Sequence, residues 1–385
     1  MVAFGVLPAA VLVSVALGGS AAAAGPGVTC GSTVTTDVTL TADLYCPSGD
    51  GLILGSEVTL DLGGHSLIGS GSSGVGVQTS PDSQGGNTIR NGTIEDWGTG
   101  IFLQDSTFGI MLPHTMSDVD LRSAPINHFF GNTLLDMTRV TAVDSRVEGQ
   151  LGGNFAISHS MLTRSPVMVF LATATIREST LVQSYVSTSA GGEVIIDSSK
   201  LDGKGIARLG DISETGITIT NSLVKNYAQP ISGLWGGVTF TGNKFINMPN
   251  GVLGNISSNI GSDGMSVITG NTFIRSGVAL RGNVPMIVEK NIFMFGDVGV
   301  EFTLSAGLPD TPPRTAEGSR AVGNVLVKNT GTGIQTDLPG LEVGGNIATK
   351  NGGYGIYAPG AVDLGGNIAF GNGIGQCVGV VCTGR

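Results

Sequence analysis

The titratable side chains of this charge-poor chain are densest in one stretch, residues 114–164. Asp118, Asp120 and Arg122 lie close together, and Arg139 and His159 each follow about one repeat later. Arginine can serve as the base that removes a proton, and grouped carboxylates can hold Ca²⁺. The sequence therefore predicts a candidate catalytic cluster made of these five residues, with Ca²⁺ as its cofactor if the chemistry is lysis. The alternative is a set of surface ion pairs.

The elements that position this cluster belong to a repeat. From residue 160 onward, Asn or Ser, any residue, and an apolar residue recur ten times at gaps of 19 to 33 residues. Self-similarity at such a period indicates a solenoid, in which each turn buries its apolar face only against its neighbours. The apolar members are Leu162, Leu181, Leu201, Leu223, Phe245, Phe273, Phe293, Leu326, Ala348 and Ala369.

A polar residue stands two positions before each apolar member, and in seven of the ten repeats it is Asn, beginning with Asn221. Asn tolerates the left-handed backbone of a sharp bend, and stacked amides can hydrogen-bond to one another. This column is therefore structural. A second, partial column comprises Asn226, Asn329, Asn351 and Asn372.

Short apolar runs between Asn and Gly residues indicate short strands joined by tight bends. Strict alternation fails just after the apolar member, because Val182, Val224, Ile246 and Ile274 are apolar as well. Two carboxylates, Asp118 and Asp120, are two residues apart, which in a strand would place them on one face.

Two segments carry a resemblance to a known family: VTLDLGGHSLIG at residues 58–69 and TIRNGTI at residues 88–94. With the repeat, they resemble the opening turns of secreted right-handed parallel β-helix repeat proteins with the pectin-lyase-like fold. The resemblance implies an all-β chain, a single right-handed parallel β-helix with capped ends. It also implies a protein that handles polysaccharides in a groove along one face.

The catalytic motifs of the family's enzymes are missing. A polygalacturonase would show Asn-Thr-Asp, Asp-Asp, Gly-His-Gly and Arg-Ile-Lys, and an alginate epimerase would show Asp-Pro-His-Asp where this chain has LPHT at residues 112–115. We therefore predict a protein that binds an extracellular polysaccharide or serves as a scaffold. The alternative is a polysaccharide lyase or epimerase that acts on acidic glycans through residues 114–164. A third hypothesis, metal delivery, depends on Met111, His114 and Met116.

A line of cations is the candidate binding site. In five repeats the residue two positions after the apolar member is basic, and these side chains could follow an acidic polysaccharide or simply keep the rod soluble. They are Arg164, Lys225, Arg275, Lys328 and Lys350.

The N-terminus predicts export. Residues 1–27 hold no charged side chain, and an apolar run followed by small residues is typical of a signal peptide ending near residue 24. We predict a signal peptide at 1–24, an N-terminal cap at 25–57, the β-helix at 58–372 and a C-terminal cap at 373–385. The mature protein would be secreted, with no membrane span.

The four cysteines allow three pairings. Local pairing, Cys30 with Cys46 and Cys377 with Cys382, would tie down the ends of the solenoid, where it is most liable to fray. No metal site is predicted from them. The net charge is −10, and a basic footprint for nucleic acid is absent. The sequence does not specify an oligomeric state.

Overall fold

The computed structural model describes residues 28–71, 73–104, 112–129, 134–205, 207–213, 216–234, 237–257, 265–281, 285–303 and 316–384. The predicted signal peptide and Met111 lie outside the described residues. Within them every regular element is a strand, and no helix is present that is long and apolar enough to cross a membrane.

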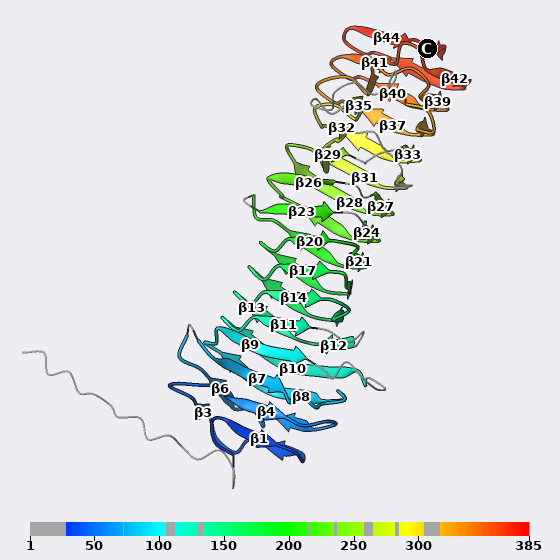
Figure 1. Ribbon diagram of the computed structural model, residues 1–385. Helices are drawn as coiled ribbons and strands as arrows, with labels where there is room; N and C mark the ends of the chain where they lie inside the picture. Colours follow the sequence, from blue (N-terminus) through cyan, green and yellow to red (C-terminus); the bar gives the residue numbers. More distant parts are fainter. Residues whose placement is uncertain are drawn as a thin grey trace, which may run out of the picture.

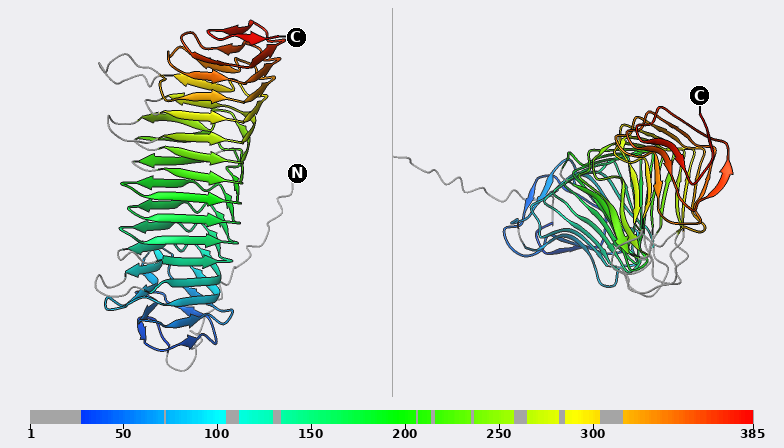
Figure 2. Two further views of the ribbon diagram at one scale, coloured as in Figure 1. Left: turned by 90° about the vertical axis from the view of Figure 1, so that its right-hand side faces the viewer. Right: turned by 90° about the horizontal axis from the view of Figure 1, so that it is seen from above.

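The chain winds into a rod in which each turn contributes one strand to each of three parallel sheets (Figure 1). Figure 2 shows the strands stacked along the rod and, from above, the turns lying over one another. This confirms the predicted all-β parallel β-helix. We number the sheets 1 to 3 in the order in which a turn visits them.

Sheet 1 has 16 strands. They are β1 Ser32–Val34, β4 Leu52–Leu54, β7 Val75–Thr79, β9 Thr99–Gln104, β11 Ile126–Phe129, β14 Val147–Gln150, β17 Val167–Phe170, β20 Val186–Ser189, β23 Arg208–Ser213, β26 Gln229–Leu234, β29 Leu253–Ser257, β32 Val278–Arg281, β35 Val300–Thr303, β38 Ile334–Thr336, β41 Tyr354–Tyr357 and β44 Gly375–Val378.

Sheet 2 follows in each turn. It comprises β2 Val38–Thr39, β5 Thr59–Asp61, the first halves of β8 Thr88–Glu95 and β10 His114–Arg122, β12 Leu134–Thr138, β15 Asn154–Ser158, β18 Thr173–Arg177, β21 Glu193–Asp197, β24 Ile217–Thr220, β27 Val238–Thr241, β30 Ser266–Thr269, β33 Met286–Glu289, β36 Arg320–Val322, β39 Glu342–Gly344 and β42 Val362–Gly365.

Sheet 3 completes the turn. It comprises β3 Leu44–Tyr45, β6 Ser66–Ile68, the second halves of β8 and β10, β13 Thr141–Val143, β16 Met161–Thr163, β19 Thr180–Val182, β22 Lys200–Asp202, β25 Leu223–Lys225, β28 Lys244–Met248, β31 Thr272–Ser276, β34 Ile292–Met294, β37 Val325–Val327, β40 Ile347–Thr349, β43 Asn367–Phe370 and β45 Cys382–Thr383.

The core is the inside of the rod, where equivalent side chains of successive turns stack in columns. In sheet 3 the three rings of Phe245, Phe273 and Phe293 are fully buried and stacked nearly parallel, with centroids 4.9 and 4.5 Å apart. Parallel strands in register place like residues one strand spacing apart, about 4.8 Å. The apolar member of each repeat is therefore the side chain that fills the interior of the rod.

Two corners bound sheet 3, and each is built from a residue with left-handed backbone followed by an inward residue, which is polar in most turns. At the corner between sheets 2 and 3, His159 (φ 51°) precedes the buried Ser160, and Gly323 (φ 67°) precedes the buried Asn324. A left-handed conformation turns the chain sharply, and glycine adopts it without a steric cost.

The inward residues of this corner form a continuous hydrogen-bonded ladder. Each side-chain oxygen accepts the backbone N–H of the equivalent residue one turn earlier, as in Asn291 N to Asn324 Oδ1 at 3.0 Å. In the Asn part of the ladder, the amide nitrogen also donates to the next amide oxygen. The ladder satisfies backbone groups that sheet pairing cannot reach at a corner.

One turn shows that the sequence alignment was wrong by a residue. The ladder member is Ser222, not Asn221, and the core residue is Val224, which pairs with Leu201 and Phe245. Asn221 takes the corner position (φ 50°) and donates to Asp197, while Leu223 is half-buried.

The second ladder lies at the corner between sheets 3 and 1. Asn329, Asn351 and Asn372 belong to it as predicted, but Asn226 does not. Asn226 instead occupies the left-handed corner (φ 58°) and donates to Asp202. The same one-residue slip therefore explains both errors.

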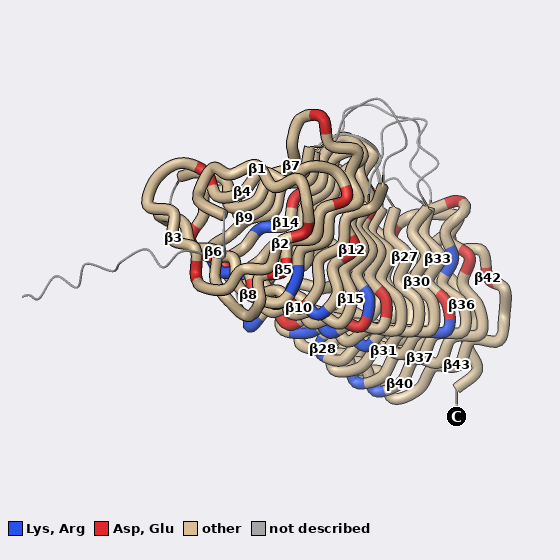
Figure 3. Tube along the Cα trace, turned by 90° about the horizontal axis from the view of Figure 1, so that it is seen from below, with Lys and Arg blue, Asp and Glu red and all other residues tan. Residues whose placement is uncertain are grey.

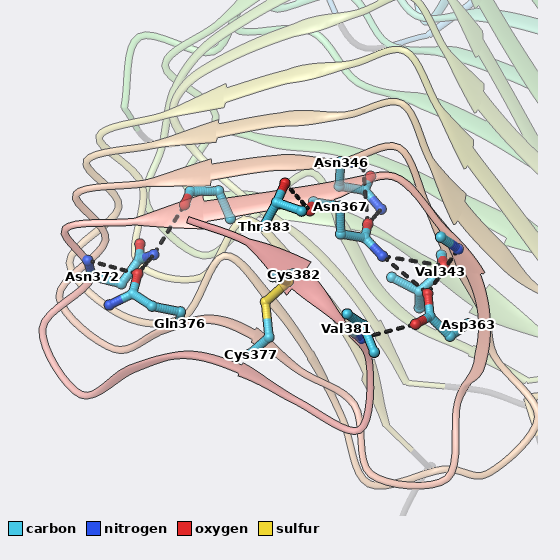
Figure 4. Close-up of a disulfide and its surroundings, with 12 residues drawn as sticks. Val343, Asn346, Asp363, Asn367, Asn372, Gln376, Cys377, Val381, Cys382 and Thr383 are labelled. Carbon is cyan, nitrogen blue, oxygen red and sulfur yellow. Dashed lines mark hydrogen bonds between the residues drawn. A yellow bond between two sulfur atoms is a disulfide. The ribbon is translucent and has the colours of Figure 1, made fainter. Parts of the chain in front are cut away.

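The rod is closed at its ends by the two predicted disulfides, Cys30–Cys46 and Cys377–Cys382. At the C-terminal end Gln376 Oε1 accepts from Asn372, and Asp363 accepts the backbone N–H of Val381 (Figure 4). Stacking begins already at β1, inside the range predicted for the N-terminal cap.

Candidate functional site

The predicted catalytic cluster lies mostly along the corner between sheets 2 and 3. Asp118, Arg139 and His159 occupy the left-handed position of three successive turns (φ 56°, 55° and 51°). Their side chains are exposed and point away from the rod. The repeat thus brings these three together, as the sequence predicts for residues one turn apart.

Ion pairs between successive turns occupy these side chains. Arg139 Nε and Nη2 donate to the two carboxylate oxygens of Asp118 at 2.6 Å each, and His159 Nε2 lies 2.7 Å from Glu178 Oε2. Hydrogen bonding to Arg139 lowers the pKa of the Asp118 carboxyl, and the same bond raises the pKa of the Arg139 guanidinium. A guanidinium held in its charged form is a poor base for removing a proton.

The other two members of the cluster lie beyond the corner, on sheet 3. The corner at Asp118 interrupts β10, so Val119 points inward and Asp120 faces outward from a different sheet. The expectation that Asp118 and Asp120 share one strand face is therefore wrong. Arg122 lies 3.5 Å from Asp120 and 3.8 Å from Glu95.

The nearby histidines His114 and His128 face the interior and are buried. Their rings are 6.0 Å apart, and the His128 ring lies 5.6 Å from that of Phe155. Met116, the other described member of the predicted metal-delivery group, is buried too. Neither His114 nor Met116 is therefore presented to a partner on the surface.

Only part of the predicted line of cations is aligned in the structure. Arg164, Arg275, Lys328 and Lys350 occupy the left-handed corner between sheets 3 and 1 (φ 49° to 57°). Lys225 lies one residue earlier, on β25, with its ammonium 3.0 Å from Asp202.

Arg164 is likewise engaged, since it donates two hydrogen bonds to Asp144 at 2.7 and 2.6 Å. The repeat therefore aligns four of the five cations, and two of the five are held by carboxylates. No ion pair involves Arg275, Lys328 or Lys350 among the described residues.

A hollow of about 240 Å³ opens instead on the outward face of sheet 1. It lies over β14, β17 and β20, and its lining mixes exposed apolar side chains with hydrogen-bonding ones. Those that define it are Glu148, Gln150, Met168, Phe170, Ser187 and Ser189. Glu148 is held from two sides, by Gln150 Nε2 and by Arg146 Nε at 2.9 Å.

From this hollow, two columns of outward-facing side chains extend along sheet 1 toward the N-terminal end of the rod. Strand register stacks like positions, so each column offers apolar and polar groups in succession. One column is Phe102, Asn127, Glu148, Met168 and Ser187; the other is Gln104, Phe129, Gln150, Phe170 and Ser189. The rings of Phe102 and Phe129 are 6.3 Å apart.

A second hollow, of about 390 Å³, adjoins sheet 1 further along the rod, where the chain passes from sheet 3 to sheet 1. Its charged lining residues are Arg275 from one turn and Asp297 and Glu301 from the next. Both hollows therefore border the same sheet.

Sequence reasoning missed both hollows. The repeat alignment was anchored on sheet 3, and the variable loops between sheets 1 and 2 hid the columns of sheet 1. The alternating VEGQ and VMVF at residues 147–150 and 167–170, twenty residues apart, were the available signal.

A metal site is not formed by the described side chains: among them no three His, Cys, Asp or Glu residues lie close enough to hold an ion. In the 114–164 cluster, the carboxylates of Asp118 and Asp144 are each held by an arginine from the next turn.

Comparisons with known proteins give no relative: no family model, no curated protein and no solved structure matches this chain. The functional argument therefore depends on the geometry alone.

The carboxylates that are paired with arginines at the two corners of sheet 3 predict acid sensitivity. Hydrogen bonds from Arg139 and Arg164 lower the pKa of Asp118 and Asp144 below the ordinary value of 3.8. The stability from these pairs is present above that value and is lost as the pH falls through the lower pKa of the folded state. We expect the melting temperature to fall between about pH 5 and pH 2.

The double variant Asp118→Asn/Asp144→Asn should show a smaller decrease in melting temperature over this pH range. Thermal unfolding monitored by circular dichroism measures it. Gln183→Asn, at an equivalent corner but without a carboxyl, is the matched control. An unchanged fall in the double variant would show that these pairs do not contribute to the acid sensitivity.

Proposed function

We propose that the protein binds a neutral polysaccharide lengthwise along the outward face of sheet 1, without cleaving it. The observation that supports this most directly is the 240 Å³ hollow, where Phe170 and Met168 lie beside Gln150, Ser187 and Ser189. Sugars present apolar ring faces and hydroxyl groups together, and such a lining meets both.

The length of the site favours a polymer. The two columns place apolar and polar side chains in succession at strand spacings of about 4.8 Å, so a polymer that lies along sheet 1 would meet both kinds of side chain repeatedly. The second hollow extends the path along the same sheet. A small ligand would not need this repetition.

Charge favours a neutral chain over an acidic one. The first hollow has a carboxylate, Glu148, which is paired with Arg146, and no cation in its lining. A polyanion bound there would find no lining cation to pair with.

Binding without catalysis is better supported than lysis or epimerisation by the 114–164 cluster. Arg139, the base that lysis would need there, is held as a cation by Asp118, and the cluster divides between a corner and sheet 3. A polysaccharide-binding scaffold outside the cell is consistent with the two disulfides.

Affinity electrophoresis of the full chain in gels that contain neutral or acidic polysaccharides tests the proposal. A neutral polysaccharide should retard the wild type, and Phe170→Ala should weaken binding about tenfold, equivalent to about 1.4 kcal/mol. Met161→Ala is the matched control, because Met161 is as exposed (46% against 39%) but lies on sheet 3.

Retardation by none of the neutral polysaccharides, or equal retardation of Phe170→Ala and wild type, would contradict the proposal. New chain ends in the same mixtures would favour the enzymatic alternative. Arg139→Ala would then show whether the 114–164 cluster is responsible.

A further inference from the structure

The C-terminal half of sheet 3 presents a largely apolar face outward. Its strands have three principal positions, of which the middle one is buried and the flanking two point outward. From β28 to β43 these outward positions hold mainly apolar side chains. They are Ile246, Ile274, Ile292, Met294, Val325, Val327, Ile347, Ile368 and Phe370, and the remaining outward positions hold Lys244, Thr272 and Thr349.

These side chains are accessible to solvent. Ile292, Ile347, Ile368 and Phe370 are each 36–38% exposed, although they are large and apolar. The failure of strict alternation in the sequence has its explanation here, because Ile246 and Ile274 face outward. Outward apolar residues on neighbouring turns lie side by side, so they form one continuous strip.

Cations outnumber carboxylates along this strip. The sheet 3 strand and its two corners in each turn from β28 to β43 cover residues 242–250, 270–277, 290–296, 323–329, 345–351 and 366–372. These segments contain five basic residues and no Asp or Glu, and the nearest carboxylates, Glu289 and Asp297, adjoin the third segment. The five are Lys244, Arg275, Lys290, Lys328 and Lys350, and all are exposed. Figure 3 shows Lys and Arg along the margin that β28, β31, β37 and β40 form.

The N-terminal half of the same sheet lacks this arrangement. There the outward positions carry charges of both signs, among them Glu95, Asp120, Arg122, Asp202 and Lys225. The strip is therefore not a general property of sheet 3 but is confined to its C-terminal turns.

The combination of apolar and basic side chains on the strip indicates which partner it fits. A second copy of the chain, docked by a two-fold axis on this strip, would bring the cations of both copies together. A soluble acidic polysaccharide would pair with the cations but would not remove the aliphatic side chains from water. A lipid surface with anionic headgroups does both, since acyl chains accept the apolar side chains and headgroups meet the flanking cations.

We propose that this face, sheet 3 from β28 to β43, docks on an anionic lipid surface. The rod would lie with its axis along the membrane plane, with Ile292 and Ile347 entering the boundary between headgroups and acyl chains. The proposal does not depend on polysaccharide binding, which uses sheet 1.

Vesicle flotation of the full chain tests the proposal, with phosphatidylcholine vesicles and with vesicles that also contain phosphatidylglycerol. The wild type should float with the anionic vesicles, and raised salt should weaken binding. Ile292→Asp/Ile347→Asp and Lys328→Glu/Lys350→Glu should each lose at least about tenfold in partitioning. Both double changes are at outward positions, and circular dichroism would confirm that each variant folds.

Met161→Asp is the matched control, because Met161 occupies the same outward column as Ile292 and Ile347 but in the N-terminal half. It should float like the wild type. Failure of the wild type to float with anionic vesicles would overturn the proposal, as would undiminished flotation of Ile292→Asp/Ile347→Asp. Binding of soluble heparin without vesicle binding would assign the cations to a polyanion and equally overturn it.

Discussion

Replacing Asn324 by alanine is expected to lower the free energy of unfolding by about 4 kcal/mol, because several buried hydrogen-bonding groups lose their partner. Asn324 is fully buried at the corner between sheets 2 and 3. Its Oδ1 accepts from the backbone and amide nitrogens of Asn291, and its Nδ2 donates to Val288 O and Asn346 Oδ1.

The measurement is urea-induced unfolding followed by circular dichroism, with hydrogen exchange and mass spectrometry to locate the loss. Faster exchange should centre on β33, β36 and their neighbours, since turns of a solenoid depend mainly on adjacent turns. Val325→Ala is the matched control: it changes the next residue, whose side chain points outward. Equal losses in the two variants would show that the ladder contributes no special stability.

Phe293→Ala is expected to destabilise the protein by about 3–5 kcal/mol, the usual range for truncating a fully buried phenylalanine. The Phe293 ring is fully buried and stacks on that of Phe273 with centroids 4.5 Å apart. The backbone of a parallel stack cannot close around the missing ring, because sheet pairing fixes the distance between turns.

Phe295→Ala is the internal control for this prediction. Phe295 lies two residues further along, at the corner, is 49% exposed and has Lys328 over its ring at 5.7 Å. Its loss should cost less than about 1 kcal/mol. The same urea experiment compares them, and a similar midpoint for the two variants would contradict a core role for the phenylalanine stack.

Much of this fold could be predicted from the sequence because the turns of a solenoid repeat one pattern of residues at a regular spacing. The apolar member and the polar residue two positions earlier marked the core column and the ladder at nine of ten turns. At the tenth, Asn221 and Ser222 are both suited to the ladder, as are Leu223 and Val224 to the core. Only the contacts of Ser222 with the turns on either side decide between them.

The candidate sites were less predictable, since a side chain's chemistry does not give the direction in which it points. Asp118 and Asp120 were separated by a corner that sits inside a single strand. The columns of sheet 1 were hidden because the loops that precede sheet 2 vary in length, which breaks the period. The adjacency of Asp118 and Arg139 followed from the repeat length alone and is found in the structure.

The backbone N–H groups of both ladders point one way along the rod, since each donates to the side-chain oxygen of the equivalent residue in the following turn. The hydrogen bonds of the corner N–H groups in one turn are therefore made only when the following turn is in place. Whole turns could therefore be duplicated or deleted in the middle of the gene without leaving an orphaned donor, whereas the chain cannot stop at an arbitrary turn. Gln376, whose Oε1 takes the amide and backbone donors of Asn372 in place of a further Asn, acts as the terminator of the second ladder.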